Sequence, residues 1–324
     1  MHRGIQPDLE GSLSRAVGMV ERVVNYGTHL IKKCDAAANQ NFVAPVFLGL
    51  HVVEALDAIA ILIRRCSVDP AKLILRSQME AMFGLSYMAL GDTERKSLQY
   101  VVGHAHARID WYKRLDPSTE QGKQLDADIK KDSTFGELDI VGLDTESTIK
   151  NLEKMFLRPE YVPVEAEWQR TRGIIKSGKI WWYNLYDGPR NVQGLAEAVN
   201  DHGFYQIMYR TYSGEMHATN AMESMHTQQG GKTFAYQPLR YPVGLPSLVQ
   251  SAVSMALRSY RTLIGMLVPE EMEPYKEWYT TQIASDFRPL DGFRIADPSR
   301  PMRMPATRAK VPPKHSKRHK RPRR

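Results

Sequence analysis

An arginine and a histidine that could act together on a phosphodiester lie seven positions apart in the stretch Phe204–Asn220. The sequence predicts a helix there, and seven residues make nearly two turns. The side chains of Arg210 and His217 would therefore share one face, about 10 Å apart in rise, with Ser213 and Gly214 between them. Arginine binds phosphate in a bidentate fork, and histidine exchanges protons near neutral pH. The pair predicts RNA cleavage in which His217 moves the proton and Arg210 stabilises the developing charge.

A structural role is the alternative for the same two residues. In that case Arg210 and His217 lie inside a helical bundle and are neutralised by Glu54, Glu80 or Glu215, because buried charges need partners. The residues predicted to form a supporting polar network are His51, Glu54, Arg76, Glu80, Tyr209 and Ser213. The two alternatives predict opposite surroundings. An active site places Arg210 and His217 in a pocket or at a dimer seam, and a structural network buries them.

Metal binding is a further chemistry that glutamate and histidine at helical spacing could support. Glu223 and His226 have the Glu-x-x-His order of four-helix di-iron proteins, whereas His51 and Glu54 reverse it. A di-iron site needs two copies in the forward order and two further carboxylates. Arg76 would also bring a cation next to the same carboxylates. The sequence therefore predicts neither a metal nor another cofactor.

An aromatic cluster precedes Gly188 and could either stack bases or close the end of a helical bundle. Its members are Trp181, Trp182, Tyr183 and Tyr186. We favour a place in the core for these residues. His104 and His106 are two positions apart, so they do not share a helical face, and we expect both at the surface.

The spacing of apolar residues predicts the helices that must position these groups. It indicates long helices over 12–34, 45–65, 70–90, 93–114 and 245–267, and shorter ones over 144–157, 163–174 and 269–285. Asp69 is predicted to cap the third helix, Asp92 to cap the fourth, and Pro189 to begin a short one. Residues 115–141 are polar, which predicts a surface excursion with a frayed helix at most. No series of strands emerges, so the predicted fold is all-α, a helical bundle with an elaborated middle, in a single domain over 1–290.

Composition limits the compartment and the class of protein. Hydrophobic residues make up 42% of the 324 residues, enough for a core. Two cysteines rule out a disulfide scaffold and indicate free thiols in a reducing compartment. The N-terminus shows no apolar signal core. The most apolar segment, 42–63, is interrupted by His51, Glu54 and Asp57, so it is a poor membrane span. We therefore expect a cytoplasmic protein that does not cross a membrane.

The C-terminal residues differ in kind from the rest. The net charge of +8 comes from residues 300–324, which hold eleven Lys or Arg and no acidic residue, and the other residues sum to about −3. A Pro-rich basic segment cannot bury a core, so we expect 291–324 to be disordered. The residues predicted to bind nucleic-acid phosphates are Lys314, Lys317, Arg318, Lys320, Arg321, Arg323 and Arg324. The alternative is a tail that is only solvated.

Several short motifs together resemble a widespread bacterial family of helical proteins, domain of unknown function 5677. They are Leu75–Glu80, Trp182-Tyr183 before Gly188, Leu195-Ala196 and Tyr209–His217. The resemblance covers roughly residues 40–225. It implies a helical fold and a bacterial source, and it implies no established activity.

A narrower resemblance concerns the arginine and histidine themselves. The pattern of an arginine followed, after four to six residues, by a histidine on the same helix is similar to the motif of HEPN domains. These are small helical ribonucleases of toxin–antitoxin and anti-phage systems. Arg210 and His217 match the upper limit of that spacing, and Thr211 departs from the Asn, Asp or His that usually follows the arginine. The resemblance implies an endoribonuclease that pairs Arg and His across a homodimer and acts on RNA. The alternative is a non-catalytic helical interaction module, in a defence or toxin–antitoxin setting, whose Arg, Glu and His residues form a structural network.

Overall fold

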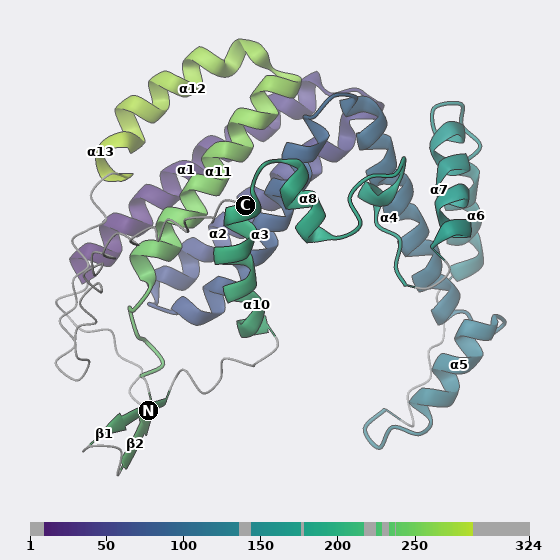
Figure 1. Ribbon diagram of the computed structural model, residues 1–324, viewed down its shortest axis with the longest axis horizontal. Coiled ribbons are helices and arrows are strands. Elements are labelled where there is room, and N and C mark those ends of the chain that lie inside the picture. The colour runs from purple at the N-terminus through teal and green to yellow at the C-terminus, as the bar shows by residue number, and fades with distance from the viewer. Residues whose placement is uncertain are drawn as a thin grey trace, which may run out of the picture. The chain divides into compact units, whose positions relative to one another are not determined.

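The long apolar helices near the N-terminus form the centre of the fold. The computed structural model describes residues 10–135, 144–175, 178–216, 225–228, 233–236 and 238–287. In it α1 (Glu10–Ala37), α2 (Val43–Arg64), α3 (Val68–Met88) and α11 (Leu245–Leu267) pack against one another (Figure 1). Helix α2 is apolar on most sides, which allows the other three helices to pack around it. Fully buried side chains from all four helices fill the core, among them Val20, Leu56, Phe83 and Val253.

Close approach of the central helices depends on glycine. A Cβ atom at Gly27 of α1 would overlap the hydroxyl group of Tyr260 and would lie 2.7 Å from Val53 Cγ2. The Tyr260 hydroxyl donates a hydrogen bond to the carbonyl of Val23 at 3.1 Å. A side chain at position 27 would therefore separate α1 from α2 and α11.

A second apolar cluster forms around α4 (Thr93–Leu115). Helices α6 (Thr145–Met155) and α7 (Val162–Ile174) pack on α4, and α5 (Glu120–Ile129) follows its C-terminal end. The buried residues of this cluster include Leu98, Val102, Phe156 and Trp168. Helix α4 therefore carries a second hydrophobic cluster and also contacts α2 and α3 of the central helices.

The chain after α7 returns to the central helices. The 3₁₀ turn η3 (Trp182–Asn184) lies against α4, and α8 (Val192–Ala198) lies against α3. Helix α9 (His202–Phe204), the π turn η4 (Tyr205–Tyr209) and α10 (Arg210–Met216) then form one helical segment, and α10 packs on α3. Strands β1 (Met225–Gln228) and β2 (Thr233–Tyr236) pair antiparallel, with Met225 opposite Tyr236.

The last described elements cover the outside of α1 and α11. They are the 3₁₀ turn η7 (Pro269–Glu271), α12 (Met272–Trp278), the π turn η8 (Tyr279–Ile283) and α13 (Ala284–Phe287). The 3₁₀ turn η2 (Gln40–Phe42) precedes α2 and lies against α4. Helix α12 lies beside α11, and η8 and α13 lie beside α1 (Figure 1). The described residues all belong to a compact unit that spans residues 1–293, and the predicted basic tail lies outside the described residues.

The all-α prediction is confirmed, with the short β1–β2 hairpin as an addition that the sequence did not predict. The predicted start of α4 is also confirmed, since the Asp92 side chain accepts a hydrogen bond from the backbone N–H of Arg95 at 3.0 Å. The described part of the predicted excursion, residues 115–135, contains more order than expected. Thr119 caps α5 by accepting from the N–H of Gly122, which stabilises a helix of ten residues in a polar segment.

Two predicted helix starts are wrong. Helix α3 begins at Val68, before Asp69, because the turn after α2 is tight. There Cys66 has φ +53°, and the N–H groups of Cys66 and Ser67 bond the carbonyls of Ile63 and Leu62, a Schellman motif with cysteine in place of glycine. The short helix α8 begins at Val192 and not at Pro189, whose carbonyl accepts a hydrogen bond from Asn184 Nδ2.

One described helical stretch, Gln40–Arg64, is long and apolar enough to cross a membrane by length and composition. The central helix of a soluble protein passes the same test, and here α2 packs against α1, α3 and α11. The expectation that the protein does not span a membrane therefore stays a prediction.

Candidate functional site

A cavity of about 650 Å³ opens between helices α2, α3 and α4 and the aromatic segment that follows α7. Residues from α2, α3 and α4 form its floor, and the segment 179–183 and α8 close its sides. Its polar and aromatic lining residues include His51, Glu54, Ser77, Glu80, Trp181 and Trp182. The cavity is large enough for a small organic molecule.

Four polar side chains of the cavity come in two pairs on neighbouring helices. His51 and Glu54 lie one turn apart on α2, and Ser77 and Glu80 lie one turn apart on α3. His51 Nε2 and Ser77 Oγ are 2.8 Å apart, a hydrogen bond that joins the two helices. The structure therefore brings together three predicted network residues, His51, Glu54 and Glu80, and adds Ser77.

A second set of polar contacts holds one wall of the cavity in place. The hydroxyl of Tyr209 donates to Glu80 Oε1 at 2.7 Å and accepts from Arg76 Nη2 at 2.7 Å. Arg76 Nε lies 3.5 Å from the same Glu80 oxygen, and its guanidinium stacks over the Tyr209 ring at 4.6 Å. Burial raises the pKa of Tyr209 to about 12, with Glu80 acting in the same direction and Arg76 against it, so this hydroxyl stays protonated. The predicted Arg76–Glu80–Tyr209 network is present and ties the π turn before α10 to α3.

Aromatic side chains also line the cavity. The ring of Trp182 packs edge-on against Tyr100 at 5.5 Å and lies 5.8 Å from Tyr87. Trp181 stacks in parallel with Tyr183 at 6.1 Å, and the ammonium group of Lys179 lies 4.1 Å from the Trp181 ring centre. Tyr183 is buried as expected, and burial, with a further effect of the Glu80 carboxylate, raises the pKa of its hydroxyl.

Trp181 does not fit the prediction that the aromatic cluster is core. It is 41% exposed, so part of its ring is open to solvent beside the contacts with Lys179 and Tyr183. Sequence alone could not separate it from Trp182, which is half-buried one position later. Tyr186 belongs to the same turn but does not line the cavity; Arg95 lies over its ring at 4.6 Å.

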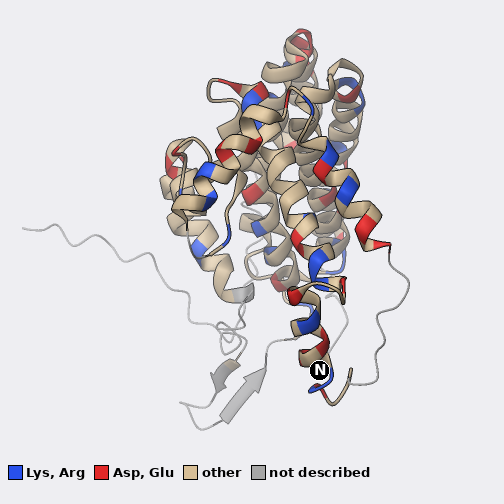
Figure 2. Cartoon of the chain, turned by 90° about the vertical axis from the view of Figure 1, so that its right-hand side faces the viewer, with Lys and Arg blue, Asp and Glu red and all other residues tan. Residues whose placement is uncertain are grey.

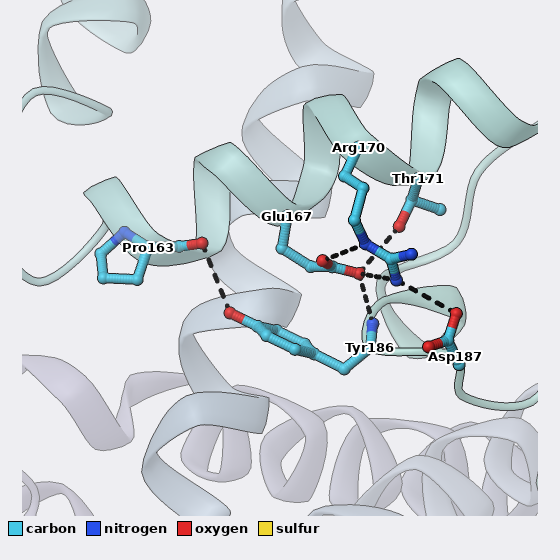
Figure 3. A network of polar contacts seen from close by, with 6 residues as sticks. All are labelled: Pro163, Glu167, Arg170, Thr171, Tyr186 and Asp187. Atoms are coloured by element: carbon cyan, nitrogen blue, oxygen red, sulfur yellow. Dashed lines mark hydrogen bonds and ion pairs between the residues drawn. The ribbon is translucent and has the colours of Figure 1, made fainter.

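Glu167 anchors the turn that carries these aromatic residues (Figure 3). Its buried carboxylate accepts two hydrogen bonds from Arg170, at 2.7 and 2.8 Å, one from Thr171 at 3.0 Å and one from the backbone N–H of Tyr186 at 2.7 Å. Arg170 also donates to Asp187 at 3.1 Å. The hydrogen bonds from Arg170 contribute most to lowering the pKa of Glu167 to about 2. Neither Glu167 nor Arg170 was singled out from the sequence; their spacing of three residues was the available signal.

Tyr186 and Asp187 show why such an anchor is needed. Both have left-handed backbone conformations, with φ of +56° and +55°, in which residues with a Cβ atom are strained by about 1–2 kcal/mol each. The hydrogen bonds to Glu167 and Arg170 offset this strain. The aromatic turn is therefore held in one conformation next to the cavity.

The candidate catalytic pair lies apart from the cavity as far as it is described. Arg210 is exposed at the start of α10, and its guanidinium donates to Gln206 Oε1 at 3.1 Å. Ser213 is half-buried, and His217 lies outside the described residues. The structural alternative for Arg210, burial against Glu54 or Glu80, is therefore not what the structure contains. The pairing of Arg210 with His217 on one face stays a prediction.

The other histidines are placed by the fold in different ways. His104 is exposed and lines the cavity. His106 is buried between the parallel rings of Phe156 and Trp168, so the expected surface position is wrong for it. Packing of α7 against α4 explains this difference, because it covers the α4 face on which His106 lies. The backbone of His226 lies in β1, whereas a di-iron Glu-x-x-His motif needs a helix; Glu223 lies outside the described residues.

Charged side chains elsewhere on the described surface form local pairs. Figure 2 shows acidic and basic residues side by side along the helices. Several are three or four residues apart, such as Lys123 with Glu120 at 2.7 Å and Lys130 with Asp126 at 2.7 Å. Such pairs keep helices solvated and do not suggest a binding site.

Comparisons with curated proteins and with solved structures found no match to this chain. The lining residues of the described cavity, Glu80 and Trp182 among them, fall inside the region that a family comparison does match. That region is residues 43–233, more than half of the chain. The chain thus belongs to the family of unknown function DUF5677.

Proposed function

We propose that this chain is a helical ligand-binding protein and that the cavity between α2, α3 and α4 is its binding site. The observation that supports this proposal is the convergence of aromatic and ionisable side chains on one formed cavity of about 650 Å³. Binding sites for small molecules are typically concave, lined mainly by apolar groups, and equipped with a few placed polar ones. The cavity has this composition.

The walls of the cavity are held in place before any ligand arrives. The His51–Ser77 hydrogen bond joins α2 to α3, and the Tyr209 hydroxyl fixes Glu80. Glu167 fixes the aromatic turn from behind. Binding to a preorganised site loses less conformational entropy, which favours affinity. These contacts support binding more directly than catalysis.

An aromatic probe and one cavity-filling substitution test the proposal. Ala107 is exposed on α4 and lines the cavity, so Ala107→Trp should occupy the site without disturbing the core. The anionic dye 1-anilinonaphthalene-8-sulfonate should bind the native wild type, and its affinity should fall at least tenfold in Ala107→Trp. Ala127→Trp, at an exposed position of α5, is the matched control and should bind like wild type. Equal dye affinity in all three proteins would remove the support for this site.

A second function is favoured by the exposure of Arg210. We propose that Arg210, together with His217, gives a HEPN-like ribonuclease activity that needs no metal, in a cytoplasmic homodimer. An exposed guanidinium can reach an RNA phosphate, whereas a buried one cannot. His217→Ala should remove cleavage, and Arg210→Lys should also fail, because an ammonium group does not reproduce the bidentate fork. An RNA-degradation assay on these variants, with their melting temperatures, tests it, and Arg158→Lys on the exposed surface is the control. A wild type without RNase activity would refute this proposal.

The basic tail belongs to the same second proposal. Residues 300–324 would hold RNA through phosphate contacts, because they carry the positive charge of the chain. Removing them should abolish most RNA affinity and flatten its dependence on salt. If the shortened chain binds RNA as tightly at moderate salt, the tail has no such role. Should both RNA experiments fail, the remaining alternative is a non-catalytic interaction module.

A further inference from the structure

A second, smaller cavity adjoins the candidate binding site. It measures about 330 Å³ and lies between α4, α7 and the segment 178–180. Four residues, Gly103, Ala107, Lys179 and Ile180, line both cavities. Lys179 is exposed, so its ammonium group is accessible at the junction. A ligand in the larger cavity can therefore contact Lys179 at its edge.

The smaller cavity is rich in hydrogen-bond donors. Arg172 and Lys179 supply two cationic groups, against a single carboxylate from Asp110. The Trp168 side chain is buried, and its Nε1–H has no hydrogen-bond acceptor among the described residues. His106 is held by its hydrogen bond to Glu165 at 2.7 Å. This combination suits an anion such as a phosphate.

The larger cavity has the opposite preference. Glu80 uses Oε1 for both of its contacts, with Tyr209 and Arg76, and its side chain is 45% exposed, which leaves Oε2 as an acceptor. Glu54 adds a second exposed carboxylate on the facing helix. Trp181, 41% exposed, and Trp182 line the same cavity, and the Lys179 ammonium lies 4.1 Å from the Trp181 ring centre. The cavity thus offers a flat stacking surface next to acceptors for N–H groups.

We propose that the ligand is a purine nucleotide, an inference that rests on the proposed binding function of the larger cavity. The base stacks on the aromatic wall at Trp181, and its ring and exocyclic N–H groups donate to Glu54 and Glu80. The phosphate lies at the junction with Lys179, on the side that faces Arg172. The larger cavity supplies carboxylates and aromatic rings for the base, and the adjoining smaller cavity supplies cations for the phosphate.

Two sources can supply this chemistry: a free mononucleotide or the phosphorylated end of an RNA chain. Isothermal titration with guanosine 5′-monophosphate tests the first. A short oligoribonucleotide with a 5′-phosphate, compared with the same oligomer ending in a 5′-hydroxyl, tests the second. Tighter binding of the phosphorylated oligomer than of the mononucleotide would assign the site to RNA ends, and the reverse order to free nucleotides. Either order supports the shared chemistry.

Substitutions separate the phosphate contact from the base contact. Lys179→Gln should lower the affinity for guanosine 5′-monophosphate at least tenfold and leave the weaker binding of guanosine unchanged, because guanosine has no phosphate. Trp181→Ala should weaken both. Lys154→Gln, at an exposed lysine of α6, is the matched control and should change neither. Equal affinity of the nucleotide for wild type and Lys179→Gln would overturn the placement of the phosphate.

The dye experiment distinguishes failure of this inference from failure of the proposed function. One possible result is that the dye binds to the wild type and not to Ala107→Trp, while nucleotides and oligomers do not bind. The nucleotide assignment is then wrong and the binding site stands. If neither the dye nor a nucleotide binds, both proposals are wrong. Displacement of the dye by guanosine 5′-monophosphate, and not by inorganic phosphate alone, is the result expected.

Discussion

Replacing Glu167 by glutamine should destabilise the fold in a way that depends on pH. The Glu167 carboxylate is 9% exposed and receives hydrogen bonds from Arg170, Thr171 and the backbone of Tyr186. Glutamine keeps an oxygen acceptor but loses the negative charge that Arg170 contacts with two nitrogens. The change therefore removes the electrostatic part of the anchor and leaves the shape of the side chain nearly unchanged.

The pKa of Glu167 sets the magnitude. The folded-state pKa of about 2, against an ordinary value of 4.5, corresponds to about 3 kcal/mol of stability at neutral pH. Arg170 is 45% exposed, so water screens part of the interaction, and we expect Glu167→Gln to lose about 2 kcal/mol. Because the folded pKa is lowered, this stability is present above the unfolded pKa and is lost as pH falls toward the folded one. The difference between wild type and variant should be about 1 kcal/mol smaller at about pH 3.5 than at about pH 7.

Urea denaturation across this pH range measures the effect. Glu273→Gln is the matched control, since Glu273 also pairs with a cation three residues later, Lys276 at 2.6 Å, but both side chains are exposed. It should change the free energy of unfolding by less than about 0.5 kcal/mol at any pH. A Glu167→Gln variant as stable as the control, or one whose deficit stays constant down to low pH, would refute the argument from charge.

Three further predictions follow from the packing of other residues. Tyr209→Phe should lower the free energy of unfolding by about 1–2 kcal/mol in denaturant titrations, because Arg76 and Glu80 lose the hydroxyl that both contact. Tyr205→Phe, at a ring stacked on Tyr209, is the control, and equal losses in the two variants would contradict this explanation. Gly27→Ala should lower the free energy of unfolding by about 1–3 kcal/mol, because the added methyl group overlaps with Tyr260 and Val53. Gly18→Ala is the control: its nearest neighbour is 3.8 Å away, and the change should raise the free energy of unfolding by up to about 1 kcal/mol. A Gly27→Ala variant as stable as wild type would show that α1 can move. Burial raises the pKa of Cys34 to about 11 and also raises the pKa of Cys66. A thiol reagent at neutral pH should therefore label both cysteines only after denaturation. Rapid labelling of the native chain would show that the thiols are accessible.

The sequence by itself determined the features that depend on neighbouring residues. Apolar residues at helical spacing identified α1, α2 and α11, because each helix must bury one side or more. Asp92 identified the start of α4, because a capping carboxylate acts on an N–H three residues away. The all-α class and the family resemblance came from the same local patterns. Local signals failed where the backbone adopts an unusual conformation. Asp69 predicted the start of α3, but the left-handed backbone of Cys66 lets the helix begin earlier, at Val68.

Only the tertiary structure decided which of the chemically interesting residues meet. Arg76 and Tyr209 were both expected in a polar network. They are 133 positions apart in the sequence, and no rule of residue spacing predicts a hydrogen bond over such a separation. Trp181 and Trp182 are equivalent in sequence, and the turn anchored by Glu167 exposes one and half-buries the other. The physical reason is that exposure and proximity depend on how helices pack, which is set by apolar contacts summed over the whole core. The exposure of Arg210 and the cavity beside Lys179 are results of that packing, and periodicity could not reveal either.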